Sequence, residues 1–165
     1  MKVLGIDPGT AACGYGIVHA SGGRLTVVDH GWWPTSARLP PEQRLKRIHD
    51  EVCELIERHE PEAVAIEESY VGADARIALS VGQARGAVLV ACARTSVPCA
   101  EYPPATVKKA VTGSGCAEKG QVQRMVKAIL ALAEPPEPHH AADALAVAIC
   151  HAMTPRTARE AVGIR

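Results

Sequence analysis

Apolar residues in the first 34 positions form short runs that are separated by turns. The runs are rich in branched apolar residues, which favours strands, and they cover 3–6, 14–20 and 25–33. Glycine-bearing segments separate the runs, and Gly22-Gly23 is a typical turn sequence. We therefore expect three strands that follow one another as a meander of hairpins.

From residue 41 onward the apolar residues recur every three or four positions, which is typical of helices with one buried face. This spacing predicts helices over 41–59, 74–95, 118–132 and 139–151, a short helix opened by Pro103-Pro104, and intervening buried strands at 63–66 and 99–102. A strand that follows a helical crossover joins its sheet in parallel. We expect one α/β domain over 1–153, a mixed five-stranded sheet flanked by helices, and a frayed tail at 154–165.

The composition is that of a globular protein, with 165 residues of which 47% are hydrophobic and 22% charged. The apolar run at 77–97 is interrupted by Gln83, Arg85 and Arg94, so no membrane span is expected. The chain opens directly with a strand, which predicts no signal peptide. Six scattered cysteines without a Cys-x-x-Cys pair indicate reduced thiols and a cytoplasmic location.

The net charge is zero, but the charges are unevenly distributed. Residues 1–75 carry a net charge of −5, residues 76–127 of +6 and residues 128–165 of −1. A basic middle segment beside acidic ones can form a positive face next to a cluster of carboxylates. This pattern keeps nucleic acid among the candidate partners, although an ordinary fluctuation of charge would give the same numbers.

Carboxylates follow two of the predicted buried strands. Asp7 ends the first strand, where Pro8 and Gly9 force a turn, and Glu67 ends the strand at 63–66. His140 and Asp143 lie three residues apart and so share one face of the last, otherwise apolar helix.

A buried carboxylate needs a partner, and carboxylate oxygens with one imidazole suit Mg²⁺ or Mn²⁺. Two such ions in one site activate water for phosphodiester hydrolysis. Taken singly, each residue also has an ordinary interpretation, Asp7 as a turn residue and Asp143 as a charge near a helix N-terminus.

Five sequence blocks occur together over residues 2–152, in the order in which they are found in a known family. The sequence resembles the RuvC family of bacterial Holliday junction resolvases in the blocks Gly5-Ile6-Asp7-Pro8-Gly9, Ala65-Ile66-Glu67, Gly82-Gln83-Ala84-Arg85-Gly86, Ala117-Glu118-Lys119 and Ala141-Ala142-Asp143-Ala144-Leu145-Ala146. The first block alone is a weak signal, whereas the five together are highly specific.

This resemblance implies a ribonuclease H-like fold and a homodimer that resolves four-way junctions in recombination and DNA repair. The implied reaction is Mg²⁺- or Mn²⁺-dependent nicking of two opposed strands, with two ions per active site, leaving 5′-phosphate and 3′-hydroxyl ends. The branch-migration proteins RuvA and RuvB are implied partners. A two-fold dimer would supply two active sites, and Gly82 and Gly86 are candidates for its contact unless their helix packs only on its own sheet.

The resemblance also assigns roles residue by residue. It implies that Asp7, Glu67, His140 and Asp143 bind the metal and act in catalysis, that Lys108 and Lys119 meet the scissile phosphates, and that Tyr70 stacks on bases near the crossover. Many relatives carry Asp where this chain has His140. Because imidazole suits softer ions than Mg²⁺, we expect this histidine to shift the metal preference toward Mn²⁺.

Three other functions share parts of this pattern. Actin-like ATP-binding proteins also carry Gly-Ile-Asp-x-Gly-Thr, but they need a second phosphate loop and a second domain, neither of which is apparent in 165 residues. A junction-binding module without cleavage would be expected to have lost a carboxylate. A nuclease of the same fold that acts on RNA–DNA hybrids stays open, although the Tyr70 loop and Lys119 favour the junction.

Overall fold

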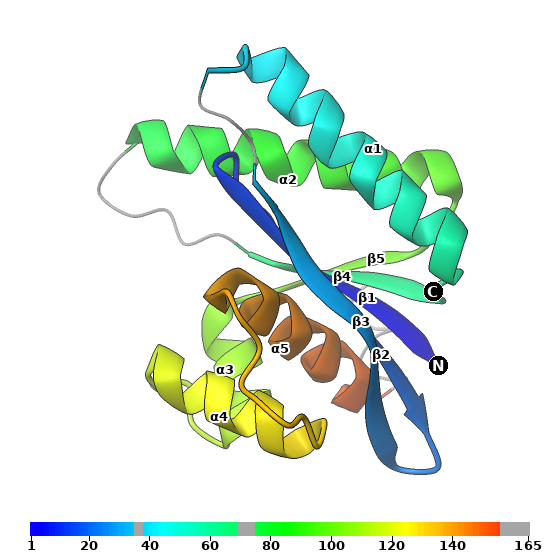
Figure 1. Ribbon diagram of the computed structural model, residues 1–165, viewed down its shortest axis with the longest axis vertical. Coiled ribbons are helices and arrows are strands. Elements are labelled where there is room, and N and C mark those ends of the chain that lie inside the picture. The colour runs from blue at the N-terminus through cyan, green and yellow to red at the C-terminus, as the bar shows by residue number, and fades with distance from the viewer. Residues whose placement is uncertain (35–37, 69–74, 156–165) are drawn as a thin grey trace.

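A central β-sheet separates two layers of helices in this computed structural model, which describes residues 1–34, 38–68 and 75–155 (Figure 1). Helices α1 and α2 cover one face, and α3, α4 and α5 cover the other. The elements are β1 (Lys2–Asp7), β2 (Ala12–Ser21), β3 (Arg24–Pro34), α1 (Pro41–His59), β4 (Ala63–Glu67), α2 (Ala75–Thr95), β5 (Cys99–Tyr102), α3 (Pro104–Thr112), α4 (Lys119–Ile129) and α5 (His139–Met153).

The sheet has the strand order β3-β2-β1-β4-β5. The meander β1-β2-β3 is antiparallel, whereas β4 lies parallel to β1 and β5 parallel to β4. The predicted mixed five-stranded sheet is therefore confirmed. Because β1 and β4 are parallel neighbours, with Ile6 opposite Ile66, the residues that follow them come out at the same edge of the sheet.

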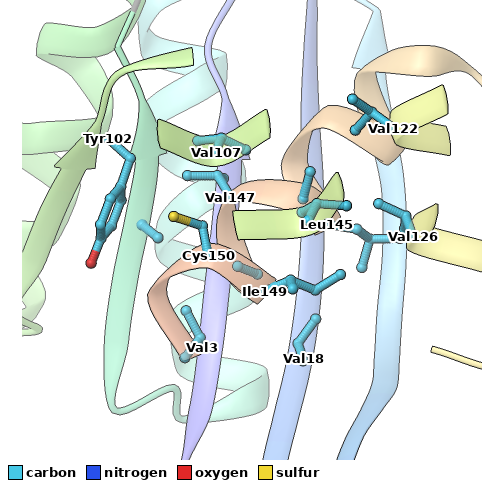
Figure 2. Close-up of a cluster of buried hydrophobic side chains, with 14 of the residues drawn as sticks. Val3, Val18, Tyr102, Val107, Val122, Val126, Leu145, Val147, Ile149 and Cys150 are labelled. Carbon is cyan, nitrogen blue, oxygen red and sulfur yellow. The ribbon is translucent and has the colours of Figure 1, made fainter. Parts of the chain in front are cut away.

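Side-chain alternation along β1 assigns its residues to the two faces of the sheet. Leu4 and Ile6 belong to the core under α1 and α2, whereas Val3 belongs to the core against α5. Figure 2 shows Val3 and Val18 beside Leu145, Val147 and Ile149 of α5 in that second core. By the same alternation, Asp7 is directed to the α5 side.

Helix α5 lies unusually close to the sheet because three glycines face it, which we call the glycine floor (Gly5, Gly14 and Gly16). A Cβ atom built on Gly14 would be 2.1 Å from the carbonyl oxygen of His140, and one on Gly5 would be 2.0 Å from that of Ala144. Neither position therefore tolerates a side chain without moving α5. This close approach brings the first turns of α5 to the end of β1.

The ends of α4 and α5 are the two boundaries that need comment. Helix α4 ends at Ile129 rather than at residue 132, because Ala131 takes a positive φ of 51° and turns the chain, while Leu130 stays buried. Helix α5 ends at Met153, and residues 156–165 of the expected tail lie outside the described residues.

Within the described part of the chain, α2 is the one helix that is long and apolar enough to cross a membrane by length and composition. It contains most of the apolar run at 77–97 for which the sequence predicted no membrane span. Its residues Ala84, Val88, Ala91 and Cys92 are buried in the core that α2 shares with α1 and the sheet. The opposite face of α2 is exposed, which explains why so little of this apolar helix is buried.

Candidate active site

A cleft of about 380 Å³ opens where β1 and β4 end, and we call it the acidic cleft. Asp7 and Glu67 enter it from the two strand ends, and His140 and Asp143 enter it from the first turns of α5. Its basic lining residues are Lys108 of α3 and Lys119 of α4. The structure thus brings together the four predicted metal-binding residues and both predicted phosphate-binding lysines.

His140 and Asp7 are directly paired in the acidic cleft. The Nδ1 atom of His140 lies 2.8 Å from Oδ2 of Asp7, within hydrogen-bond distance. This hydrogen bond raises the pKa of His140, and it outweighs the opposing effect of partial burial. His140 therefore gains protonated character while it faces Asp7.

Glu67 is the most strongly perturbed carboxyl group of the cleft. Burial, reinforced by the negative charges of Asp7 and Asp143, raises its pKa to about 8. Burial and Asp7 also raise the pKa of Asp143, while Lys119 opposes this shift with its Nζ atom 3.5 Å from Oδ2. The carboxylates repel one another in a partly buried site, which is a feature of functional clusters.

The chemistry of these donors fits a divalent cation, because a bound cation would relieve the repulsion among three carboxylates. Oxygen donors with one imidazole suit Mg²⁺ or Mn²⁺. As the side chains stand, no three His, Cys, Asp or Glu groups converge on a common point anywhere in residues 1–34, 38–68 and 75–155. Three of the four donors already have partners, since His140 pairs with Asp7 and Asp143 with Lys119.

The two lysines occupy different positions at the cleft. Lys108 is half-buried and lines it, whereas the adjacent Lys109 is exposed and is not part of the lining. Lys119 begins α4, and its side chain is 70% exposed. Tyr70, the predicted stacking residue, lies outside the described residues.

Sequence reasoning missed how α5 reaches the site. Gly14 and Gly16 are easily interpreted as hairpin residues, yet in the structure they belong to the glycine floor. The sequence did contain a signal for this close packing. Glycines occur at alternate positions of the first two strands, and the last helix is rich in alanine, so both surfaces are small enough to approach closely. Glu68 also lines the acidic cleft without having been predicted there.

The mixed sheet, with the helix that carries His140 and Asp143 packed across β1 and β2, defines a ribonuclease H-like protein. The yeast mitochondrial Holliday junction resolvase Ydc2 shares this fold, with a TM-score of 0.66 at 14% identity over 91% of this chain and 77% of that one. Thermus thermophilus RuvC, solved in complex with a Holliday junction substrate, matches with a TM-score of 0.88 and 44% identity over 92% of this chain and 93% of that one.

Sequence comparisons agree with the structural ones. The model of the family described as crossover junction endodeoxyribonuclease RuvC matches residues 3–151. The RuvC protein of Pelotomaculum thermopropionicum is 51% identical over 152 residues, which are 92% of this chain and 93% of that protein. The chain therefore belongs to the RuvC family of crossover junction endodeoxyribonucleases, which are metal-dependent nucleases.

Proposed function

We propose that this protein resolves four-way DNA junctions by nicking two opposed strands, and that the acidic cleft performs the cleavage. The observation that carries the proposal is that Asp7, Glu67 and Asp143 line one cleft together with Lys108 and Lys119. Carboxylates that hold cations beside lysines that bind phosphate are what phosphodiester hydrolysis requires.

Each side chain of the cleft has a distinct role in this proposal. Asp7, Glu67, Asp143 and His140 would hold two Mg²⁺ or Mn²⁺ ions, whose chemistry when bound would be the activation of water and the stabilisation of the leaving oxygen. Lys108 and Lys119 draw the scissile phosphate toward the carboxylates by charge. The Nδ1 atom of His140 pairs with Asp7, which leaves Nε2 as the ring nitrogen that can serve as a ligand, and Tyr70 stacks on a base near the crossover.

A homodimer would place two such clefts on opposed strands of one junction. Helix α2 supports this arrangement, because Gly82 and Gly86 have no atom within 4 Å of where a Cβ would lie. Leu79 and Val90 are 66% and 60% exposed, and their spacing puts them on the same helical face as the glycines. An apolar face with small residues at its centre allows close packing against a second copy.

Partners and location follow from the same proposal. RuvA and RuvB would deliver the junction by branch migration. All six cysteines are free thiols, which supports a cytoplasmic location.

Cleavage of a synthetic four-way junction tests the proposal. A linear duplex and an RNA–DNA hybrid serve as alternative substrates, each incubated with Mg²⁺ and with Mn²⁺. We expect paired symmetric nicks in the junction alone, lost in Asp7→Asn and retained in Asp50→Asn. Asp50 lies on the exposed surface of α1, so this variant makes the same chemical change outside the cleft.

Other outcomes would select the alternatives. Tight binding of the junction without nicks in either metal would indicate a non-cleaving module. Cleavage of the hybrid instead of the junction would retain the metal chemistry and overturn the substrate.

A further inference from the structure

A second cleft of about 420 Å³ adjoins the acidic cleft, and we call it the side cleft. It is lined by residues 9–12 of the loop between β1 and β2, by Arg76, Ile77 and Ser80 in the first turns of α2, and by His140. The two clefts share four lining residues, which are Gly9, Ala12, Val81 and His140. They are therefore continuous, and His140 forms the wall between them.

The side cleft differs from the acidic cleft in charge. Among its described lining residues there is no carboxylate, whereas Arg76 supplies a guanidinium group. The hydroxyl groups of Thr10 and Ser80 are hydrogen-bonded to each other and join the β1–β2 loop to α2. Guanidinium and hydroxyl groups are the usual donors to the phosphates of a DNA backbone.

We propose that the side cleft binds the DNA strand adjacent to the scissile phosphate, with Arg76 and the Thr10–Ser80 hydroxyl pair contacting a flanking phosphate. This inference rests on the proposed function and names a phosphate subsite of the same reaction. A phosphate at the acidic cleft has neighbours on both sides along its strand. Lys108 and Lys119 line the acidic cleft itself, whereas Arg76 lies beyond the His140 wall in the side cleft.

The geometry of a nucleic acid strand supports this assignment. Consecutive phosphates of one strand advance about 3.4 Å along a duplex axis, so a strand with one phosphate beside Asp7 must continue into the adjoining space. The loop that separates the clefts is tightly closed, because a Cβ on Gly9 would lie 2.4 Å from the carbonyl oxygen of Ala12. Ile77 is exposed at the side cleft and offers an apolar surface to a sugar or base.

The test combines charge removal on the protein with charge removal on the DNA. Junctions that carry a neutral methylphosphonate at single positions flanking the scissile phosphate are titrated in EDTA, which prevents cleavage, with the unmodified chain and with Arg76→Gln. We expect one flanking position at which the neutral linkage weakens binding of the unmodified chain but has no further effect on Arg76→Gln. Arg76→Gln should also reduce the slope of log affinity against log salt by about 0.9.

Arg24→Gln provides the matched control, because Arg24 is exposed at the β2–β3 turn, at the opposite end of the sheet from Asp7. It should leave the methylphosphonate pattern and the salt slope unchanged. A second variant, Ser80→Ala, leaves the charge of the side cleft unchanged. It should weaken binding of the unmodified junction about threefold, and a methylphosphonate at the same flanking position should then have a smaller effect. An unchanged pattern in both Arg76→Gln and Ser80→Ala would overturn the subsite.

Two further outcomes separate the possible failures. If Arg76→Gln changes the mass in solution from dimer to monomer, Arg76 serves a second copy of the chain and the phosphate assignment is wrong. If the unmodified chain fails to nick the junction at all, the proposed function fails, whereas normal nicking with an unchanged Arg76→Gln pattern rejects the subsite alone.

Discussion

The ammonium group of Lys119 lies 3.5 Å from a carboxylate oxygen of Asp143, so a lysine proposed to bind DNA is directed toward a residue proposed to bind metal. The lysine comes from α4 and the aspartate from α5. In the free protein, Lys119 therefore opposes metal binding at Asp143. A DNA phosphate that attracts Lys119 would release this carboxylate, which couples the binding of substrate and metal.

Lys119→Gln should therefore bind metal more tightly and cut more slowly. In the absence of DNA we expect Mn²⁺ affinity, measured by calorimetry, to rise about two- to fivefold, since an exposed ion pair is worth up to ~1 kcal/mol. Junction cleavage should fall at least tenfold, because a phosphate contact is lost. Lys109→Gln changes an exposed neighbour outside the cleft and should do neither; equal metal affinity in Lys119→Gln and the unmodified chain would refute the coupling.

Glu67 makes the stability of the metal-free protein depend on pH. Its pKa is raised from 4.5 to about 8, so between these values the folded state holds a proton that the unfolded state has lost. The free energy of unfolding must then fall as pH rises through this window. Glu67→Gln lacks this titration and should be more stable than the unmodified chain by about 4 kcal/mol at pH 8 and equally stable near pH 4.5.

Urea unfolding in EDTA at several pH values measures this difference. The informative quantity is the stability of Glu67→Gln minus that of the unmodified chain, because other groups titrate equally in both. A difference that stays constant from pH 5 to pH 8 would show that Glu67 is not perturbed. Saturating Mg²⁺ should reduce the difference by stabilising the ionised carboxylate.

His140→Asp should lower the preference for Mn²⁺ over Mg²⁺. The substitution replaces an imidazole with a harder oxygen donor, and it removes the hydrogen bond to Asp7. The ratio of cleavage rates in the two metals, measured in single turnovers, is expected to fall about tenfold. An unchanged ratio would mean that His140 does not set metal preference.

Gly14→Ala should displace α5 and damage the acidic cleft. The added methyl group would lie 2.1 Å from the carbonyl oxygen of His140, which cannot yield without moving the helix. We expect a loss of about 2–4 kcal/mol in unfolding free energy and a loss of junction cleavage. Gly120→Ala is the control, since its methyl group would meet only Arg124 at 3.4 Å; equal stability of the two variants would exclude close packing at the glycine floor.

Leu79→Glu should dissociate the proposed homodimer. Leu79 is 66% exposed on α2, so a charge there costs the isolated chain little but would be desolvated against a second copy. Sedimentation should show a dimer for the unmodified chain and a monomer for the variant. Val28→Glu, an equivalent change on exposed β3, should leave the dimer intact, and dimers in both variants would place the contact elsewhere.

The sequence predicted the elements well because each one has a clear local signal. Pro41 suits the first turn of α1 and Pro61 ends its pattern, so its bounds were predicted to the residue. Asp7 and Glu67 were each predicted to end a buried strand, and the structure brings them to one edge because β1 and β4 are parallel neighbours. The end of α4 was missed because the positive φ of Ala131 has no local signature in an alanine.

The pairings within the cleft could not be predicted in the same way. The hydrogen bond between His140 and Asp7 joins residues 133 positions apart, and it depends on how closely α5 approaches the sheet. The distance between α5 and the sheet is set by the absence of side chains on Gly5 and Gly14. Glycine is also common in ordinary turns and strands, so the sequence alone does not reveal this role. The side cleft was missed for a similar reason, since Thr10 and Ser80 carry no catalytic signature and meet only in three dimensions.

Helix α5 holds His140 and Asp143 in its first turns and is buried along nearly its whole length. Its central amides can exchange with solvent only when the whole domain opens, so hydrogen exchange there should report global unfolding. The geometry of the acidic cleft and the fold are then lost in one event. Heat inactivation should follow the unfolding curve, without a range of temperatures in which a folded chain is inactive.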